Sequence, residues 1–209
     1  VFERAYSSNP VVYEVNTENT TGFENVRAGS GDDTITGDIG DNVLVGDAGG
    51  DTLIGGDGAD SLYGYRHDFA NGSTDGNDNL SGGSGDDTLV GGAGDDVLDG
   101  GLGSDTLTGD GGSSDYEQGG TSGTDTFVLR LGDGGSSLSG ADVITDFTDG
   151  TDVLGLDNDL QYTDLFIAQG TGDNANDTII SSGSEYLAIL QEISVSALSE
   201  ADFTPVDIA

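Results

Sequence analysis

A nine-residue period runs through the middle of the chain and limits its fold more than any other feature. Eleven units align, starting at residues 28, 37, 46, 55, 64, 73, 82, 91, 100, 109 and 120, with a two-residue slip near residues 113–119. Position four is Gly in ten units, position six is Asp in eight, and position eight is apolar or aromatic in ten. This agreement indicates one short structural unit that is stacked many times.

The first six positions of each unit favour a turn, and the last three favour a strand. Gly adopts backbone angles that other residues adopt only at a cost, and triplets such as "TLV" at residues 88–90 point one central apolar side chain inward. Because one such strand buries nothing alone, two nine-residue units should form an 18-residue coil, and stacked coils bury a column of Leu. The sequence therefore predicts an all-β solenoid with two narrow parallel sheets that face each other.

Charge decides which partners such a solenoid can have. The chain carries 40 Asp and Glu against 4 Lys and Arg, which gives a net charge of −36, and it contains no Cys. This charge excludes nucleic acid as a partner and disfavours anionic membrane surfaces. The lack of Cys excludes disulfides and thiolate metal sites, and no apolar run is long enough to insert into a membrane. Low hydrophobicity with high charge is typical of disorder, but here Asp recurs at fixed offsets from Gly.

If unit n stacks on unit n+2, the position-six side chains form two rows. One row would be Asp33, Asp51, Phe69, Asp87, Asp105 and Asp125, and the other Asn42, Asp60, Asp78, Asp96 and Ser114. Carboxylates about 5 Å apart repel each other unless a cation lies between them. Ca²⁺ accepts carboxylate and backbone carbonyl oxygens, whereas Mg²⁺ needs a stricter octahedral geometry. The alternative interpretation is a series of solvated Asp-Gly turns without metal.

Neighbouring ligands define the predicted sites. The expected pairs are Asp33/Asp51, Asp87/Asp105, Asp105/Asp125, Asp60/Asp78 and Asp78/Asp96, with Asn42/Asp60 as a weaker sixth. We therefore expect about five to seven Ca²⁺ ions. Asp142, Asp146, Asp149 and Asp152 form either one further site or ordinary surface turns.

One unit breaks the pattern. Residues 64–72, "GYRHDFANG", lack the Gly of position four, the Asp of position six and the Leu of position eight. We expect this unit to leave the sheet as a loop and to interrupt one row at Phe69, which cannot bind Ca²⁺. The other row should continue past it through Asp60, Asp78 and Asp96.

The repeat Gly-Gly-x-Gly-x-Asp-x-U-x, in which U is a large apolar or aromatic residue, resembles the calcium-binding nonapeptide of the RTX (repeats-in-toxin) family of bacterial proteins. The resemblance implies a right-handed parallel β-roll over residues 28–128, flanked by an N-terminal cap over residues 1–27 and a β-rich C-terminal cap over residues 129–209. In that cap, "DTIISSG" and "EYLAILQ" predict two strands, and "SALSEADF" predicts a short helix or turn with Ser196 as N-cap. The terminal "VDIA" resembles the secretion signal of type I exporter substrates.

These features together predict a secreted module that folds on binding extracellular Ca²⁺. Its roles would be in secretion and in cell-surface or matrix structure, through self-assembly or surface association. The alternative is the C-terminal RTX part of a secreted hydrolase or epimerase with its catalytic domain upstream. Within these residues we expect no enzyme, because HExxH, G-x-S-x-G and phosphate-loop motifs are missing and the lone His67 lies in the broken unit.

Position seven carries a series of threonines. Thr34, Thr52, Thr88, Thr106 and Thr126 would share one sheet, with Ala70 between them. Such a ladder either binds ice or another ordered surface, or consists of ordinary outward strand residues.

Overall fold

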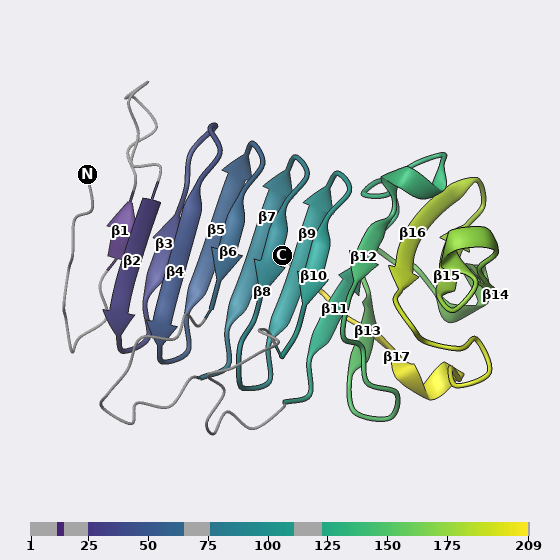
Figure 1. Cartoon of the computed structure of the whole chain (residues 1–209). Coiled ribbons are helices and arrows are strands. Elements are labelled where there is room, and N and C mark those ends of the chain that lie inside the picture. The colour runs from purple at the N-terminus through teal and green to yellow at the C-terminus, as the bar shows by residue number, and fades with distance from the viewer. Residues whose placement is uncertain (1–11, 15–24, 65–75, 111–122, 209) are drawn as a thin grey trace.

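The computed structural model describes residues 12–14, 25–64, 76–110 and 123–208, which form an all-β solenoid of two facing sheets (Figure 1). The first sheet is parallel throughout and contains, in spatial order, β1 (Val12–Glu14), β3 (Thr34–Thr36), β5 (Thr52–Asp57), β7 (Asn79–Ser84), β9 (Val97–Leu102), β11 (Thr126–Leu129), β13 (Val153–Leu156) and β17 (Phe203–Pro205). The second sheet contains β2 (Asn25–Ser30), β4 (Val43–Ala48), β6 (Ser61–Tyr63), β8 (Thr88–Val90), β10 (Thr106–Thr108), β12 (Asp142–Ile144), β16 (Glu185–Leu190), β15 (Thr178–Ser182) and β14 (Leu165–Gln169).

Consecutive strands from β1 to β13 alternate between the sheets, so each coil of the roll gives one strand to each sheet. The position-eight side chains point between the sheets and are at most 2% exposed. They are Ile35, Leu44, Leu53, Leu62, Leu80, Leu89, Leu98, Leu107 and Phe127. Each buried Leu contributes about 2 kcal/mol through the apolar area it removes from water. The predicted all-β fold and its apolar column are confirmed.

The spacing between stacked strands is not uniform. Thr34 pairs with Thr52, and Thr88 with Thr106, at the predicted 18 residues. Thr52, however, pairs with Asn79, 27 residues later, because β5 lies directly beside β7. β6 likewise lies directly beside β8. One nine-residue unit is thus left out of the stack, and the units from residue 73 to residue 108 lie on the sheet opposite the one that uninterrupted stacking predicts.

The sequence of the skipped unit explains this change. Residues 64–72 have Asn71 at position eight, so the unit has no apolar side chain to place in the core. From residue 65 to residue 75, including His67, Phe69 and Ala70, the chain lies outside the described residues. A second skip occurs between β9 and β11, where Val97 pairs with Thr126 at 29 residues. The predicted slip and Ser114 lie outside the described residues between these two strands.

The skips also divide the predicted threonine ladder. On the first sheet, position seven reads Thr34, Thr52, Asn79, Val97 and Thr126, while Thr88 and Thr106 lie on the second sheet. The prediction of one continuous threonine face is therefore wrong.

The sheets continue past residue 128 through β12, β13, β16 and β17 (Figure 1). The two strands predicted from "DTIISSG" and "EYLAILQ" are β15 and β16, which form an antiparallel hairpin with Gly183 at φ 60° in the turn. Short 3₁₀ turns are η1 (Leu138–Gly140), η2 (Tyr162–Asp164), η3 (Gly172–Asn174) and η4 (Glu200–Asp202). The described segments contain no helix that is long and apolar enough to span a membrane.

Ser199, rather than the predicted Ser196, is the N-cap of η4. Its hydroxyl accepts a hydrogen bond from the Ala201 N–H at 3.3 Å, and Asp202 accepts one from the Ser199 N–H at 2.7 Å. This reciprocal pair requires an acid three residues after the cap, which Ser199 has and Ser196 lacks.

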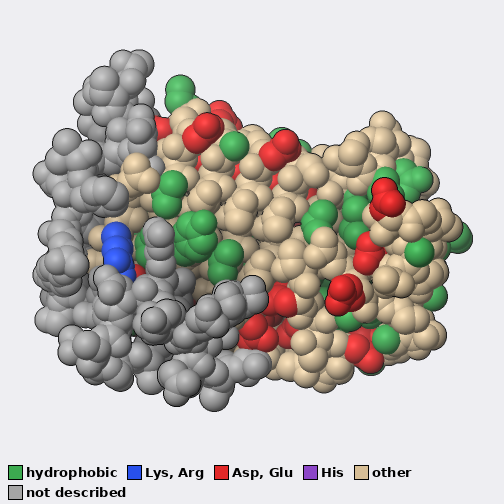
Figure 2. Space-filling view, in the orientation of Figure 1, with side chains coloured by type: hydrophobic (Ala, Val, Ile, Leu, Met, Phe, Trp, Pro, Cys, Tyr) green, Lys and Arg blue, Asp and Glu red, His purple; other side chains and the backbone are tan. Residues whose placement is uncertain are grey.

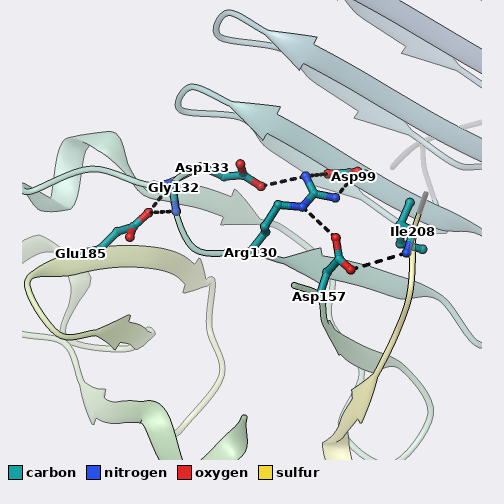
Figure 3. Close-up of polar contacts among 8 residues, drawn as sticks. Asp99, Arg130, Gly132, Asp133, Asp157, Glu185 and Ile208 are labelled. Carbon is teal, nitrogen blue, oxygen red and sulfur yellow. Dashed lines mark hydrogen bonds and ion pairs between the residues drawn. The ribbon is translucent and has the colours of Figure 1, made fainter. Parts of the chain in front are cut away.

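Arg130, which follows β11, joins the last coils through a cluster of ion pairs (Figure 3). Its guanidinium contacts Asp99 of β9 at 2.9 Å, Asp133 at 3.0 Å and Asp157, after β13, at 2.8 Å. The Asp157 carboxylate also accepts the Ile208 N–H at 3.5 Å. These bonds raise the pKa of Arg130 against the opposing effect of burial. At this end of the roll the Arg130 guanidinium therefore supplies the positive charge that pairs with the clustered carboxylates.

Candidate metal-binding turns

The turns between strands lie along the two long edges of the roll, where acidic side chains gather on the face shown in Figure 2. The position-six residue stands at the start of each strand and is at most 4% exposed. Two rows result. The first row, which leads into the first sheet, is Asp33, Asp51, Asp78, Asp96, Asp125 and Asp152. The second row, which leads into the second sheet, is Asn42, Asp60, Asp87, Asp105 and Asp142.

Each row is a ladder of hydrogen bonds between the backbone and the carboxylates. The N–H of Asp33 donates to Oδ1 of Asp51 at 2.8 Å, and the N–H of Asp60 donates to Oδ1 of Asp87 at 2.7 Å. The same bond recurs between Asn42 and Asp60, Asp51 and Asp78, Asp78 and Asp96, Asp87 and Asp105, Asp96 and Asp125, Asp105 and Asp142, and Asp125 and Asp152. All nine predicted ligands therefore lie in the two rows.

The composition of the rows corrects four parts of the prediction. The predicted pairs Asp33/Asp51, Asp78/Asp96, Asp87/Asp105 and Asn42/Asp60 are neighbours. The pairs Asp60/Asp78 and Asp105/Asp125 are wrong, and Asp51/Asp78, Asp60/Asp87 and Asp96/Asp125 replace them. The expected interruption at position 69 and the uninterrupted row Asp60–Asp78–Asp96 are wrong as well. The cause is the same in each case, because a skipped unit moves later Asp residues to the opposite edge.

The second carboxylate oxygen gives the turns their chemistry. In Asp51, Asp60, Asp87, Asp105 and Asp125, Oδ2 is buried and has no hydrogen-bond partner. A buried polar atom without a partner costs about 1–3 kcal/mol, and more when it is charged. Five such oxygens in two ladders are a large cost that a bound cation would remove.

Glycine at position one makes room beside this oxygen. A Cβ on Gly82 would lie 2.6 Å from the Gly100 carbonyl oxygen of the next turn and closer still to Oδ2 of Asp87. A Cβ on Gly55 would meet Oδ2 of Asp60 in the same way. Carboxylate and carbonyl oxygens thus face one small space that only Gly leaves open. Nine of the eleven units have Gly at position one, and at Gly55 and Gly82 a carboxylate oxygen and a carbonyl oxygen lie where a Cβ would stand.

Burial perturbs the same carboxyl groups. It raises the pKa of Asp51, Asp105 and Asp125 to about 7 and that of Asp87 to about 6. The backbone hydrogen bond from the preceding turn lowers each pKa by a smaller amount, and neighbouring Asp residues raise it further. Burial likewise raises the pKa of Asp142 to about 8. Each charge lies where water cannot solvate it well.

The donor set suits Ca²⁺. Among the described residues, no three acidic or histidine side chains converge to hold a metal. A cation here would therefore take one or two carboxylates and complete its shell with backbone carbonyls. Ca²⁺ accepts such mixed oxygen shells with flexible geometry, whereas Mg²⁺ demands a regular octahedron.

Asn42 is a neutral member of the second row. Its Oδ1 accepts the Asp38 N–H at 2.7 Å, and its Nδ2 donates to Oδ1 of Asp38 at 3.5 Å. The amide is satisfied within its own turn, which fits its rank as the weaker predicted ligand.

The four acids left open in the cap do not form one site together. Asp142 and Asp152 extend the two rows, accepting the N–H groups of Asp105 at 3.0 Å and Asp125 at 3.1 Å. Asp152 also accepts the Thr148 N–H at 2.7 Å. The signal for both was a partial repeat in which Gly stands two residues before the Asp and an apolar residue two residues after it, in "GADVIT" at residues 140–145 and "GTDVLG" at residues 150–155, without the glycines of positions one and two.

Asp146 and Asp149 lie outside the two rows. The Asp146 carboxylate accepts the N–H groups of Gly109 at 2.9 Å and Asp110 at 3.0 Å, which closes the turn that follows β12. Asp149 is exposed.

Solved structures resemble this chain only weakly. The extracellular lipase LipA from Serratia marcescens aligns at 16% identity and a TM-score of 0.35, covering 86% of this chain and 39% of the lipase. The AlgE6R3 subunit of the Azotobacter vinelandii mannuronan C5-epimerase aligns at 23% identity and a TM-score of 0.35, covering 84% of this chain and 78% of the subunit. The chain thus spans about two fifths of the lipase.

Sequence comparison is more specific. No curated protein matches the chain. Residues 18–53, 45–68 and 73–107, however, match the family model described as RTX calcium-binding nonapeptide repeat (4 copies). These matches contain the Gly and Asp positions from which the first four coils of the two ladders are built. The stretch within residues 18–107 therefore consists of RTX calcium-binding nonapeptide repeats.

Proposed function

We propose that this chain is a calcium-binding module of a secreted protein and that it folds when it meets extracellular Ca²⁺. The observation that carries the proposal is the set of five buried carboxylate oxygens without hydrogen-bond partners. A roll without cations would keep these charges desolvated. The same roll with cations between its turns would convert that cost into binding free energy.

The ions would be held by the row carboxylates and by the carbonyl oxygens of the position-one glycines. Asp51, Asp60, Asp87, Asp105 and Asp125 supply the oxygens without partners. Bound Ca²⁺ would neutralise adjacent carboxylates and join each turn to the next. The role proposed for these groups is therefore cation binding.

The charge of the chain suggests why folding should wait for Ca²⁺. At a net charge of −36 the metal-free chain repels itself. An extended chain suits passage through a type I exporter where free Ca²⁺ is scarce, and folding after export would keep the module outside. A structural role at the cell surface or in an extracellular matrix completes the proposal.

Calcium titration tests the folding step. Far-UV circular dichroism of the full chain in EGTA should show an unordered spectrum, and added Ca²⁺ should produce β signal at roughly 10⁻⁴–10⁻³ M. The same concentration of Mg²⁺ should not produce this β signal. The transition should be steep, because each ion joins two turns. A complete β spectrum in EGTA contradicts the proposal.

A matched pair of variants connects the transition to the rows. Asp105→Ala removes a buried row carboxylate and should raise the Ca²⁺ midpoint. Asp173→Ala removes one negative charge from an exposed 3₁₀ turn and should leave the midpoint unchanged. Equal midpoints for the two variants would show that net charge, rather than the rows, controls the response.

A further inference from the structure

A second ladder runs beside each row, formed by the residues at position five. The side-chain oxygen of a position-five residue accepts the N–H of the position-five residue in the next turn. Gly50 donates to Asp32 at 3.0 Å, Ala59 to Asp41 at 3.0 Å, Asp95 to Asn77 at 3.0 Å, Ser104 to Asp86 at 3.0 Å, and Thr124 to Asp95 at 2.8 Å.

The two ladders run in opposite directions. Between the turns that end at Asp87 and Asp105, the Asp87 N–H donates forward to Oδ1 of Asp105 at 2.8 Å. The Ser104 N–H donates backward to Oδ1 of Asp86 at 3.0 Å. Each pair of bonds therefore clamps two turns from both sides. Since the next-turn carbonyl oxygen and Oδ2 of Asp87 face each other across this gap, the clamp sets their separation.

The position-five groups do not fit the role of ligands. All five are exposed, and in each the Oδ1 acceptor is already engaged by a backbone N–H. Asn77 makes the same bond as the four Asp residues. An acceptor oxygen is thus what the position requires, and negative charge is not.

Two neighbouring stacking steps cannot form the outer bond. Where β5 lies on β7 and β6 lies on β8, the position-five residues are Gly50 and Ala59, which carry no side-chain oxygen. The inner bonds remain there, from Asp51 to Asp78 at 2.6 Å and from Asp60 to Asp87 at 2.7 Å. These two steps, which also span the skipped unit, therefore keep only the inner of the two hydrogen bonds.

We propose that Asp32, Asp41, Asn77, Asp86 and Asp95 are positioning residues for Ca²⁺. They hold adjacent turns at the separation that the ion requires, and the steps from β5 to β7 and from β6 to β8 lack this support because Gly50 and Ala59 have no side-chain oxygen. This inference rests on the proposed calcium-binding function and adds to it a set of residues that do not touch the ion.

Loss and rescue at one position test the mechanism. Asp86→Ala removes the acceptor and should lower the folding equilibrium constant at fixed Ca²⁺ by about fivefold, the value of one hydrogen bond of about 1 kcal/mol. Asp86→Asn keeps the acceptor and removes the charge, so it should restore the wild-type Ca²⁺ midpoint. Asp86→Leu, of similar size to Asn, should not.

Gain at the incomplete step is the complementary test. Ala59→Asn should accept the Asp86 N–H, and it should raise the folding constant at fixed Ca²⁺ by a similar factor of about five. Ala59 already has a Cβ, so the change adds only the outer part of the side chain. Ala59→Leu adds a similar volume without an acceptor and should give no gain.

Calorimetric Ca²⁺ binding and the circular dichroism midpoint should be measured for all of these variants. An Asp86→Asn variant as impaired as Asp86→Ala would show that charge is what matters and would overturn the inference. Identical Ca²⁺ affinities across the series would overturn it as well. If the wild type folds fully in EGTA, the folding proposal fails, and the order of calorimetric affinities still decides the positioning role.

Discussion

Lowering the pH in the absence of Ca²⁺ is expected to fold part of the roll. Burial raises the pKa of Asp51, Asp105 and Asp125 from the ordinary 3.8 to about 7. The folded chain therefore holds protons that the unfolded chain has released between about pH 4 and pH 7. Because the folded state binds more protons in this window, the stability of the metal-free fold falls as the pH rises.

The size of the effect follows from these shifts. A shift of about three units corresponds to about 4 kcal/mol per carboxyl group, which we halve to about 2 kcal/mol for solvent screening. Three such groups cost about 6 kcal/mol near pH 7, comparable with the 5–15 kcal/mol total stability of a typical domain. At about pH 5 roughly half of this cost disappears, because the folded groups are protonated.

Chelator-treated protein should be followed by far-UV circular dichroism from about pH 7 to about pH 5, above the isoelectric point of about 4.1. The β signal should grow as the pH falls. A triple variant, Asp51→Asn, Asp105→Asn and Asp125→Asn, keeps the Oδ1 acceptors, as Asn42 does, and removes the charges. It should show β structure at neutral pH without Ca²⁺ and little pH dependence. A wild-type spectrum that is unordered and unchanged down to pH 5 would refute the reasoning.

Three further changes test other parts of the structure. Gly82→Ala places a Cβ 2.6 Å from a carbonyl oxygen of the next turn. The overpacking should destabilise the folded state by about 1–3 kcal/mol, and the Ca²⁺ midpoint of folding should rise accordingly. Gly40→Ala, with its nearest neighbour at an ordinary 3.4 Å, should not raise the midpoint. The effects of Asp60→Ala and Asp87→Ala on the Ca²⁺-dependent folding free energy should be non-additive by about 1 kcal/mol, measured by calcium titration. Additive effects would support uninterrupted 18-residue stacking instead, in which the two residues are not neighbours. Arg130→Met should lower the unfolding free energy in saturating Ca²⁺ by about 3–5 kcal/mol, measured by urea titration; Arg130→Lys should not rescue it, because an ammonium cannot replace the guanidinium fork.

The repeat and the Asp residues of the rows were predictable because each unit carries the information in its own nine residues. Each unit carries its own turn glycines, its own Asp and its own inward apolar residue, so reading one unit is enough to infer a strand, a turn and a cation ligand. Residues 82–108, where three regular units follow one another, were predicted correctly in coil length and in the pairing of Asp87 with Asp105.

The rows were less predictable, because row membership depends on which units enter the stack. Residues 64–72 keep the length of a unit, so counting by nine keeps them in register. The described strands are nonetheless shifted by nine residues there, since Ser61 pairs with Thr88, and the unit carries Asn71 where other units carry an apolar residue. One skipped unit of nine residues moves the row residues from Asp78 to Asp105 by half a coil, to the opposite edge of the roll, and the second skip before β11 returns Asp125 to the first row.

The cap shows the same division between local and tertiary information. The strands of the β15–β16 hairpin were visible as apolar runs around Gly183. Asp142 and Asp152 were ambiguous, because only stacking on Asp105 and Asp125 distinguishes a row member from a surface turn. The Arg130 cluster could not be predicted from the sequence for the same reason, since it joins Asp99 to Asp157 across three coils.

The sequence by itself thus determined that this chain is an all-β roll with repeated Asp-Gly turns of the RTX nonapeptide type, because each nonapeptide holds that information within nine residues. The tertiary structure alone decided which Asp faces which, where a unit is skipped, and which oxygens remain without a hydrogen bond. Those outcomes depend on the packing of neighbouring coils, where one skipped unit moves Asp78, Asp87, Asp96 and Asp105 to the row opposite the one that counting by nine predicts.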